Sequence, residues 1–132
     1  MVTAHENHQL ARPWLERAIA GEFRLFLAAH SLAECFATLT RLPRGLGVSP
    51  AQASSIIRGN LIQRAKATIV ALGTDDYLAV LDELSRGIIA GGVIYDALIA
   101  RAARLHHAKV VTFNHRHFVH LVPDPTDLVI PR

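Results

Sequence analysis

The chain has 132 residues, of which 51% are hydrophobic, and its formal net charge is +3 at pH 7 with a sequence pI near 9.6. This length and apolar content predict one packed domain over residues 1–132 and argue against a disordered chain. The single cysteine, Cys35, excludes an internal disulfide and any zinc site built from several cysteines. Charges interrupt every apolar stretch before it reaches membrane-spanning length, and no signal-peptide pattern opens the sequence. We therefore expect a cytoplasmic protein with no membrane partner.

The first half of the chain has mostly helical patterns. Apolar spacing, turn residues and the Ser49-Pro50 helix start predict, in order, a helix over 6–20, a strand over 23–29, and helices over 31–42 and 50–64. Ser31 is followed three residues later by Glu34, which is the pattern of a capping box that satisfies free backbone amides at a helix start. This structural role competes with a functional role for the Glu34 carboxylate, and the pattern leaves both open.

The second half alternates helices with short β-branched runs. It predicts a strand over 67–72, a helix over 74–87 capped by Thr74, a helix after Gly91-Gly92, a strand over 109–114, a turn or short helix over 115–118 and a strand over 128–130. This alternation indicates an α/β fold with a mainly parallel sheet. Ligands bind such sheets beyond the carboxyl ends of the strands. Glu34, Asp96 and Asn114 can therefore meet at one edge.

Acidic residues stand in the first turns of two of these helices. Asp96 follows Gly91-Gly92 closely, and the pair Asp75-Asp76 follows Thr74. A carboxylate at such a position can hold a cation, but the helix dipole alone also favours an acid there. For Asp75-Asp76 the dipole interpretation is preferred, whereas for Asp96 the rest of the sequence decides.

Three segments of the sequence resemble motifs of PIN-domain proteins, in the same order and at similar spacing. The first is Ser31-Leu32-Ala33-Glu34 with Thr38 and Arg41 downstream, the second is Tyr95-Asp96-Ala97-Leu98-Ile99-Ala100, and the third is Thr112-Phe113-Asn114-His115-Arg116-His117-Phe118. The resemblance covers nearly the whole chain, and the VapC toxins of toxin–antitoxin pairs look most similar. It implies a PIN-like three-layer α/β/α fold with a mainly parallel central sheet that lacks the family's usual first strand.

The resemblance also implies an activity, a cofactor and partners. PIN-type toxins are endoribonucleases that hydrolyse RNA phosphodiester bonds with Mg²⁺ or Mn²⁺, and a VapB-type antitoxin neutralises them. By position, Glu34 matches the family's second acid, Asp96 its third, Asn114 a further site position and Thr112 a nearby hydroxyl residue. These four residues are the implied catalytic set, and Glu34, Asp96 and Asn114 are the implied metal ligands. Their oxygens are the ligand type that hard divalent cations take.

One departure from the family pattern affects the expected activity. The family's first acid ends a strand that would precede residue 1, and neither Glu6 nor Glu16 replaces it by motif. We expect a cation site with less negative charge than the family's. Three explanations for the missing acid stay open: the native chain could start upstream, this chain could be a decayed copy of the gene product, or another segment could take the place of the missing strand. The alternative function is therefore a catalytically impaired PIN-like protein that acts only in dimer or antitoxin binding. An unrelated α/β ligand-binding domain is a third possibility, but no phosphate-binding glycine motif supports it.

Basic residues and histidines near these motifs permit contact with RNA. His115, Arg116 and Arg41 are the candidates for binding phosphate; His115 and Arg116 could equally be exposed loop residues, and for Arg41 surface solvation is the commoner reason. Arg101, Arg104 and Arg44 could extend a basic rim, with surface solvation as the commoner reason for such residues. A zinc site from His115, His117 and His120 would need converging ligands that this spacing does not ensure.

A homodimer is the expected assembly, because the family resemblance implies one. The predicted first helices also carry more apolar surface than a small domain buries easily, at Trp14, Leu15, Leu39 and Leu42.

Overall fold

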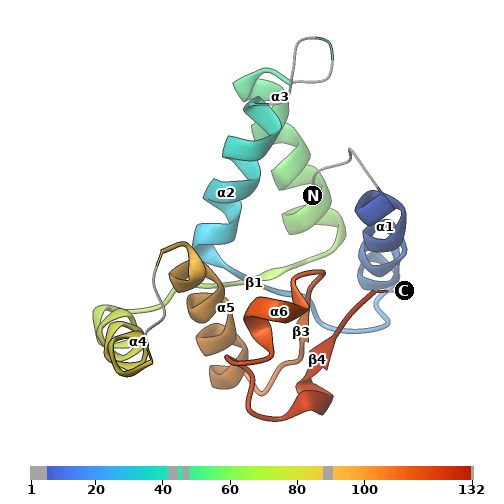
Figure 1. The fold of residues 1–132 in the computed structure, drawn as a ribbon. Helices are drawn as coiled ribbons and strands as arrows, with labels where there is room; N and C mark the ends of the chain where they lie inside the picture. Colours follow the sequence, from blue (N-terminus) through green and yellow to red (C-terminus); the bar gives the residue numbers. More distant parts are fainter. Residues whose placement is uncertain (1–5, 42–44, 46–47, 88–90, 132) are drawn as a thin grey trace. The chain divides into compact units, whose positions relative to one another are not determined.

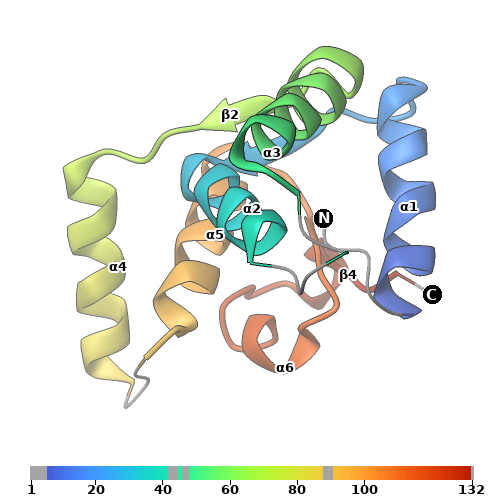
Figure 2. The ribbon, with the colours of Figure 1, turned by 90° about the horizontal axis from the view of Figure 1, so that it is seen from above.

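The computed structural model describes residues 6–41, 45, 48–87 and 91–131, with side chains from residue 12 onward (Figures 1 and 2). Expectations that concern residues 1–5, Leu42 and Arg44 therefore fall outside the described residues. The chain divides into two compact units, residues 1–69 and 70–132. Within the described residues, no helix is long and apolar enough to cross a membrane.

The first unit packs its helices around a small apolar core. Its elements are α1 (Glu6–Ile19), β1 (Phe26–Ala28), α2 (Ala29–Thr40), α3 (Pro50–Ile56), the π-helix η1 (Ile57–Arg64) and β2 (Thr68–Val70), whose last residue belongs to the second unit. Leu39 of α2 is buried against Ala53 of α3 and Ile57 of η1, and Cys35 packs beside them as an apolar filler. The β1 and β2 strands form a two-stranded sheet, and next to it the Thr68 amide donates to the Leu25 carbonyl at 2.9 Å.

The start of α3 agrees with its sequence pattern. The Ser49 hydroxyl accepts from the Gln52 amide at 3.1 Å, and the Gln52 side chain accepts from the Ser49 amide at 2.9 Å, with Pro50 following the cap. The predicted helix over 50–64 continues without a break, but from Ile57 onward it is wound as a π-helix. The Ala65 amide accordingly donates five residues back, to the Asn60 carbonyl at 3.0 Å.

Two cap predictions are wrong because the helices begin earlier than the pattern suggests. Helix α2 starts at Ala29, directly after β1, and its cap residue Ala28 makes no side-chain hydrogen bond. Ser31 and Glu34 therefore lie inside the helix and do not form its capping box. In the second unit, Gly73 and not Thr74 precedes the first turn of α4 (Thr74–Arg86), and the Gly73 amide donates to Asp76 at 3.2 Å.

The second unit places α5 (Val93–Leu105) at the centre of two apolar clusters. Ala97 and Leu98 pack against Val80 of α4, while Ala100 packs against Val110 and Phe118. Phe118 belongs to α6 (His115–Phe118), so the predicted short helix at 115–118 is confirmed. These contacts fix α6 beside α5 by a single buried aromatic side chain.

The strands of this unit are parallel, as the sequence predicts, but shorter. Strand β3 (Val110–Val111) pairs with β4 (Leu128–Val129), with Val110 opposite Leu128 and Val111 opposite Val129. The short 3-10 helix η2 (Pro125–Asp127) leads into β4. The Thr112 amide extends the pairing by donating to the Val129 carbonyl at 3.0 Å. The protein is therefore a helix-rich α/β chain whose described strands form small sheets.

Candidate catalytic site around Asp96

Asp96 lies in the first turn of α5, where the packing of its neighbours turns it outward. The next two residues, Ala97 and Leu98, face the core and are only 3% and 2% exposed, so Asp96 lies on the neighbouring, more open face of the helix. The preceding turn depends on Gly91, whose φ of 78° lies in the left-handed region that favours glycine. The Asp96 side chain is 21% exposed, which leaves it partly shielded and still accessible.

A chain of hydrogen bonds connects Asp96 to the segment after β3. His117 Nδ1 lies 2.7 Å from Asp96 Oδ2, and the side-chain amide of Asn114 lies 2.8 Å from the same nitrogen. The Asn114 backbone amide donates to Thr112 Oγ1 at 2.9 Å, which holds the turn in front of α6. The structure thus brings Asp96, Asn114 and Thr112 into one polar cluster, with His117 at its centre.

His117 is the residue of this cluster that the sequence motifs did not single out. The sequence suggests it only as one of three histidines for a zinc site, whereas its contact is with a carboxylate 21 residues earlier in the sequence. A signal was present, because His117 is three residues after Asn114 and a short helix places such residues on one side.

Glu34 and Arg41 belong to the first unit and have local partners there. The Glu34 side chain is 54% exposed, and its Oε1 lies 3.7 Å from Nε2 of His30, one helical turn before it. Arg41 follows the end of α2, where its Nε donates to the Ala37 carbonyl at 3.2 Å. Glu34 thus presents an exposed carboxylate on α2.

His115 and Arg116 open α6 and are both exposed. His115 lines an open cavity of about 330 Å³ whose other walls are apolar and include Val122, Pro123 and Ile130. Within the part of the chain that the structure describes, Arg116 makes no ion pair, so its charge is available to a phosphate.

The donor chemistry near Asp96 suits a hard cation, although a closed ligand set is not formed. One carboxylate and one amide group supply the oxygen type that Mg²⁺ and Mn²⁺ take. Over the described ranges, no three Asp, Glu, His or Cys side chains gather around a common point. His115, His117 and His120 accordingly form no zinc site in this structure.

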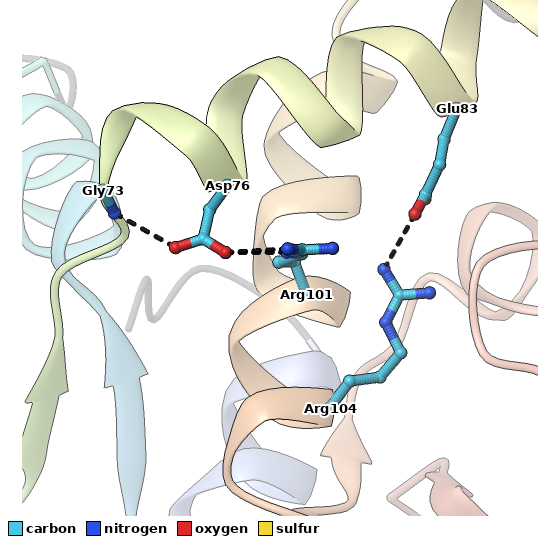
Figure 3. A network of polar contacts seen from close by, with 5 residues as sticks. All are labelled: Gly73, Asp76, Glu83, Arg101 and Arg104. Atoms are coloured by element: carbon cyan, nitrogen blue, oxygen red, sulfur yellow. Dashed lines mark hydrogen bonds and ion pairs between the residues drawn. The ribbon is translucent and has the colours of Figure 1, made fainter.

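Of the Asp75-Asp76 pair, Asp76 has a structural role. Asp76 Oδ1 accepts from the Arg101 guanidinium at 2.9 Å, and its Oδ2 accepts from the Gly73 amide at 3.2 Å (Figure 3). Arg104 of α5 likewise contacts Glu83 of α4, at 3.4 Å. The two arginines of α5 are therefore engaged with acids of α4, and the expectation that they form a basic rim for RNA is not supported.

The Leu39 side chain also has a partner inside its own unit. It is 7% exposed and belongs to the core of α2, α3 and η1, whereas Trp14 and Leu15 are half-buried. Leu39 therefore contributes little to the apolar surface expected to drive dimer formation, whereas Trp14 and Leu15 keep part of theirs.

Comparison with known proteins assigns the chain to a family. The PIN domain family model matches residues 1–121. Ribonuclease VapC27 of Mycobacterium tuberculosis is 32% identical over 112 residues, which are 85% of this chain and 74% of that protein. Ribonuclease VapC40 of the same species is 30% identical over 110 residues, which are 83% of this chain and 75% of that protein. The chain therefore belongs to the PIN-domain family.

Proposed function

We propose that this protein is a toxin-type endoribonuclease that hydrolyses RNA phosphodiester bonds with the help of Mg²⁺ or Mn²⁺. The observation that carries the proposal is the polar cluster of Asp96, Asn114 and Thr112, which unites two sequence-distant motifs of a PIN-domain chain. The names of the relatives VapC27 and VapC40 as ribonucleases support the same reaction. Glu34 completes the proposed catalytic set by its motif position.

Asp96, Asn114 and Glu34 would hold the cation, since carboxylate and amide oxygens are the ligands that it takes. When bound, a divalent ion supplies an activated water and offsets the negative charge that develops on the phosphate. The protein groups orient the reactants. Asp96 is fixed on a helix packed by Ala97 and Leu98, and Asn114 is fixed by its bond to Thr112.

The exposed basic residues beside the cluster would bind the RNA backbone. His115 and Arg116 precede His117 on α6, so they stand next to the hydrogen-bonded cluster in the same short helix. Arg41 is a further candidate from the first unit. Phosphate contacts of this kind are sequence-independent and weaken as salt is added.

The proposed partners follow from the VapC relationship. We propose that a VapB-type antitoxin binds and neutralises this chain, that the toxin forms a homodimer and that it acts in the cytoplasm. A mass corresponding to the monomer at high micromolar concentration, measured by light scattering, would contradict the dimer.

The central test is RNA cleavage with Mn²⁺ or Mg²⁺ by the wild type and by Asp96→Asn. Loss of a carboxylate ligand removes several kcal/mol of charge stabilisation, so we expect cleavage to fall by about 100-fold or more. Asp75→Asn is the matched control, because Asp75 is an exposed acid in the first turn of α4. We expect it to cleave at the wild-type rate; equal rates for Asp96→Asn and wild type would contradict the proposal.

The second candidate is a PIN-like protein that binds an antitoxin or a second copy without cleaving RNA. The donor set favours it, because over the described ranges no three Asp, Glu, His or Cys side chains gather around a common point. The same experiment separates the two candidates. A folded wild type that cleaves no RNA with either metal, and still binds its partner, indicates the second candidate.

A further inference from the structure

The contact between His117 and Asp96 joins α6 to the first turn of α5 over a short distance. Its 2.7 Å separation is typical of a charge-assisted hydrogen bond, and it joins side chains of different exposure, 45% for His117 and 21% for Asp96. The imidazole comes from α6, a helix of one turn that Phe118 anchors against α5. Phe118 therefore anchors α6, and the residue before it, His117, contacts Asp96.

The chemistry of the contact fixes where the proton lies. An ionised carboxylate can only accept, so Nδ1 must carry a hydrogen and donate it to Asp96 Oδ2, whether the imidazole is neutral or charged. The same nitrogen cannot also accept from the Asn114 amide, which lies 2.8 Å away. The structure places Asn114 Nδ2 at this distance, and the contact becomes a hydrogen bond when the amide is turned so that its oxygen faces Nδ1.

The two oxygens of Asp96 differ as a result. Oδ2 is held by His117, while Oδ1 has no hydrogen-bond partner among the described residues of 70–132. We infer that His117 is a positioning residue, which fixes the Asp96 carboxylate through Oδ2 so that Oδ1 faces the incoming ligand. This inference rests on the proposed function, since it assigns to His117 a role toward the proposed cation ligand.

A positioning role predicts a measurable effect of moderate size. Groups that hydrogen-bond to metal ligands typically change metal affinity or activity by about 10- to 100-fold when they are removed. His117→Ala should therefore weaken Mn²⁺ binding by about 10-fold or more. We expect kcat to fall by a larger factor than the factor by which the KM for RNA changes. The chain should remain folded, because Phe118 and not His117 fills the core position of α6.

Two further variants test which ring nitrogen matters. The side-chain nitrogen of asparagine and Nδ1 of histidine are both attached to Cγ, so His117→Asn can still present a donor to Asp96. The nitrogen of glutamine is one bond further out and corresponds to Nε2. We expect His117→Asn to recover most of the lost Mn²⁺ affinity and His117→Gln to recover little.

The experiment measures Mn²⁺ affinity of the RNA-free full chain, by the electron paramagnetic resonance signal of free Mn²⁺, alongside cleavage kinetics. His120→Ala is the matched control, because His120 is exposed and lies outside the polar cluster. Weaker binding in His117→Ala, with recovery in His117→Asn alone, supports the inference. Equal binding and equal kcat in wild type and His117→Ala overturn it while the proposed function stands. A folded wild type that neither binds Mn²⁺ nor cleaves RNA overturns both.

Discussion

The first turns of α4 and α5 each hold an aspartate that contacts another element, yet the partners differ. Asp76 uses both oxygens within the protein, one for Arg101 and one for the Gly73 amide (Figure 3). Asp96 meets a histidine on one oxygen only. An arginine is always charged and satisfies a carboxylate permanently, whereas an imidazole donates a single hydrogen bond. The same helix position therefore serves structure in α4 and is open to chemistry in α5.

Removing the Asp76 carboxylate should lower the stability of the fold more than removing its neighbour Asp75. Asp76→Ala removes a partly buried ion pair and a hydrogen bond at the helix start, so we expect the free energy of unfolding to fall by about 1–2 kcal/mol. Asp75→Ala, one residue earlier and exposed, should change it by less than about 0.5 kcal/mol. Urea denaturation measures both. Equal losses in the two variants would contradict the structural role assigned to Asp76.

A smaller effect distinguishes the two ion pairs that join α4 to α5. The Asp76–Arg101 contact is 2.9 Å with side chains 23% and 27% exposed, while Glu83–Arg104 is 3.4 Å with 44% and 40% exposed. Exposed pairs contribute little, because solvent screens them and two flexible side chains must be ordered. A double-mutant cycle to alanine should give a coupling energy below about 0.5 kcal/mol for Glu83–Arg104 and a larger one for Asp76–Arg101. A larger coupling energy for Glu83–Arg104 than for Asp76–Arg101 would contradict this prediction.

Much of the fold could be predicted because its signals are local. The Ser49-Pro50 start of α3 and the short helix at 115–118 depend on residues close in sequence, and both are present. The parallel pairing of β3 with β4 is not local, and it was predicted from the alternation of helices with short β-branched runs. The starts of α2 and α4 could not be predicted from capping patterns. Each helix begins a residue or two earlier than its pattern, since β1 runs directly into α2 and Gly73 precedes α4.

The candidate site was only partly predictable for a similar reason. Motif order pointed to Asp96, Asn114 and Thr112, which the structure brings together. The partner of Asp96 could not be read from the pattern, because the contact spans 21 residues and depends on how α6 packs on α5. The engagement of Arg101 with Asp76 spans 25 residues and was hidden in the same way.

Asp124 is a third carboxylate of the same unit, and unlike Asp76 and Asp96 it is hydrogen-bonded by a residue two positions later in the sequence. Its Oδ1 accepts from the Thr126 hydroxyl at 2.7 Å and from the Thr126 amide at 2.9 Å, just before η2. The Thr126 hydroxyl, followed by the amide, lowers the pKa of Asp124 from its ordinary value of 3.8. Asp124 is thus an exposed acid whose hydrogen bonds come from its own turn.

The lowered pKa fixes the sign of a pH dependence. Because the folded chain binds this proton less readily than the unfolded chain, ionised Asp124 stabilises the fold at pH values above 3.8. That contribution is lost as the pH falls through the folded pKa. The melting temperature of Asp124→Ala should therefore lie slightly below that of the wild type near neutral pH, and this difference should shrink in acid. Asp124→Asn keeps an acceptor oxygen without a titrating charge, so its difference from Asp124→Ala should not change with pH. If the gap between wild type and Asp124→Ala is the same at about pH 2 and about pH 7, the charge of Asp124 contributes nothing and only the shape of its turn matters.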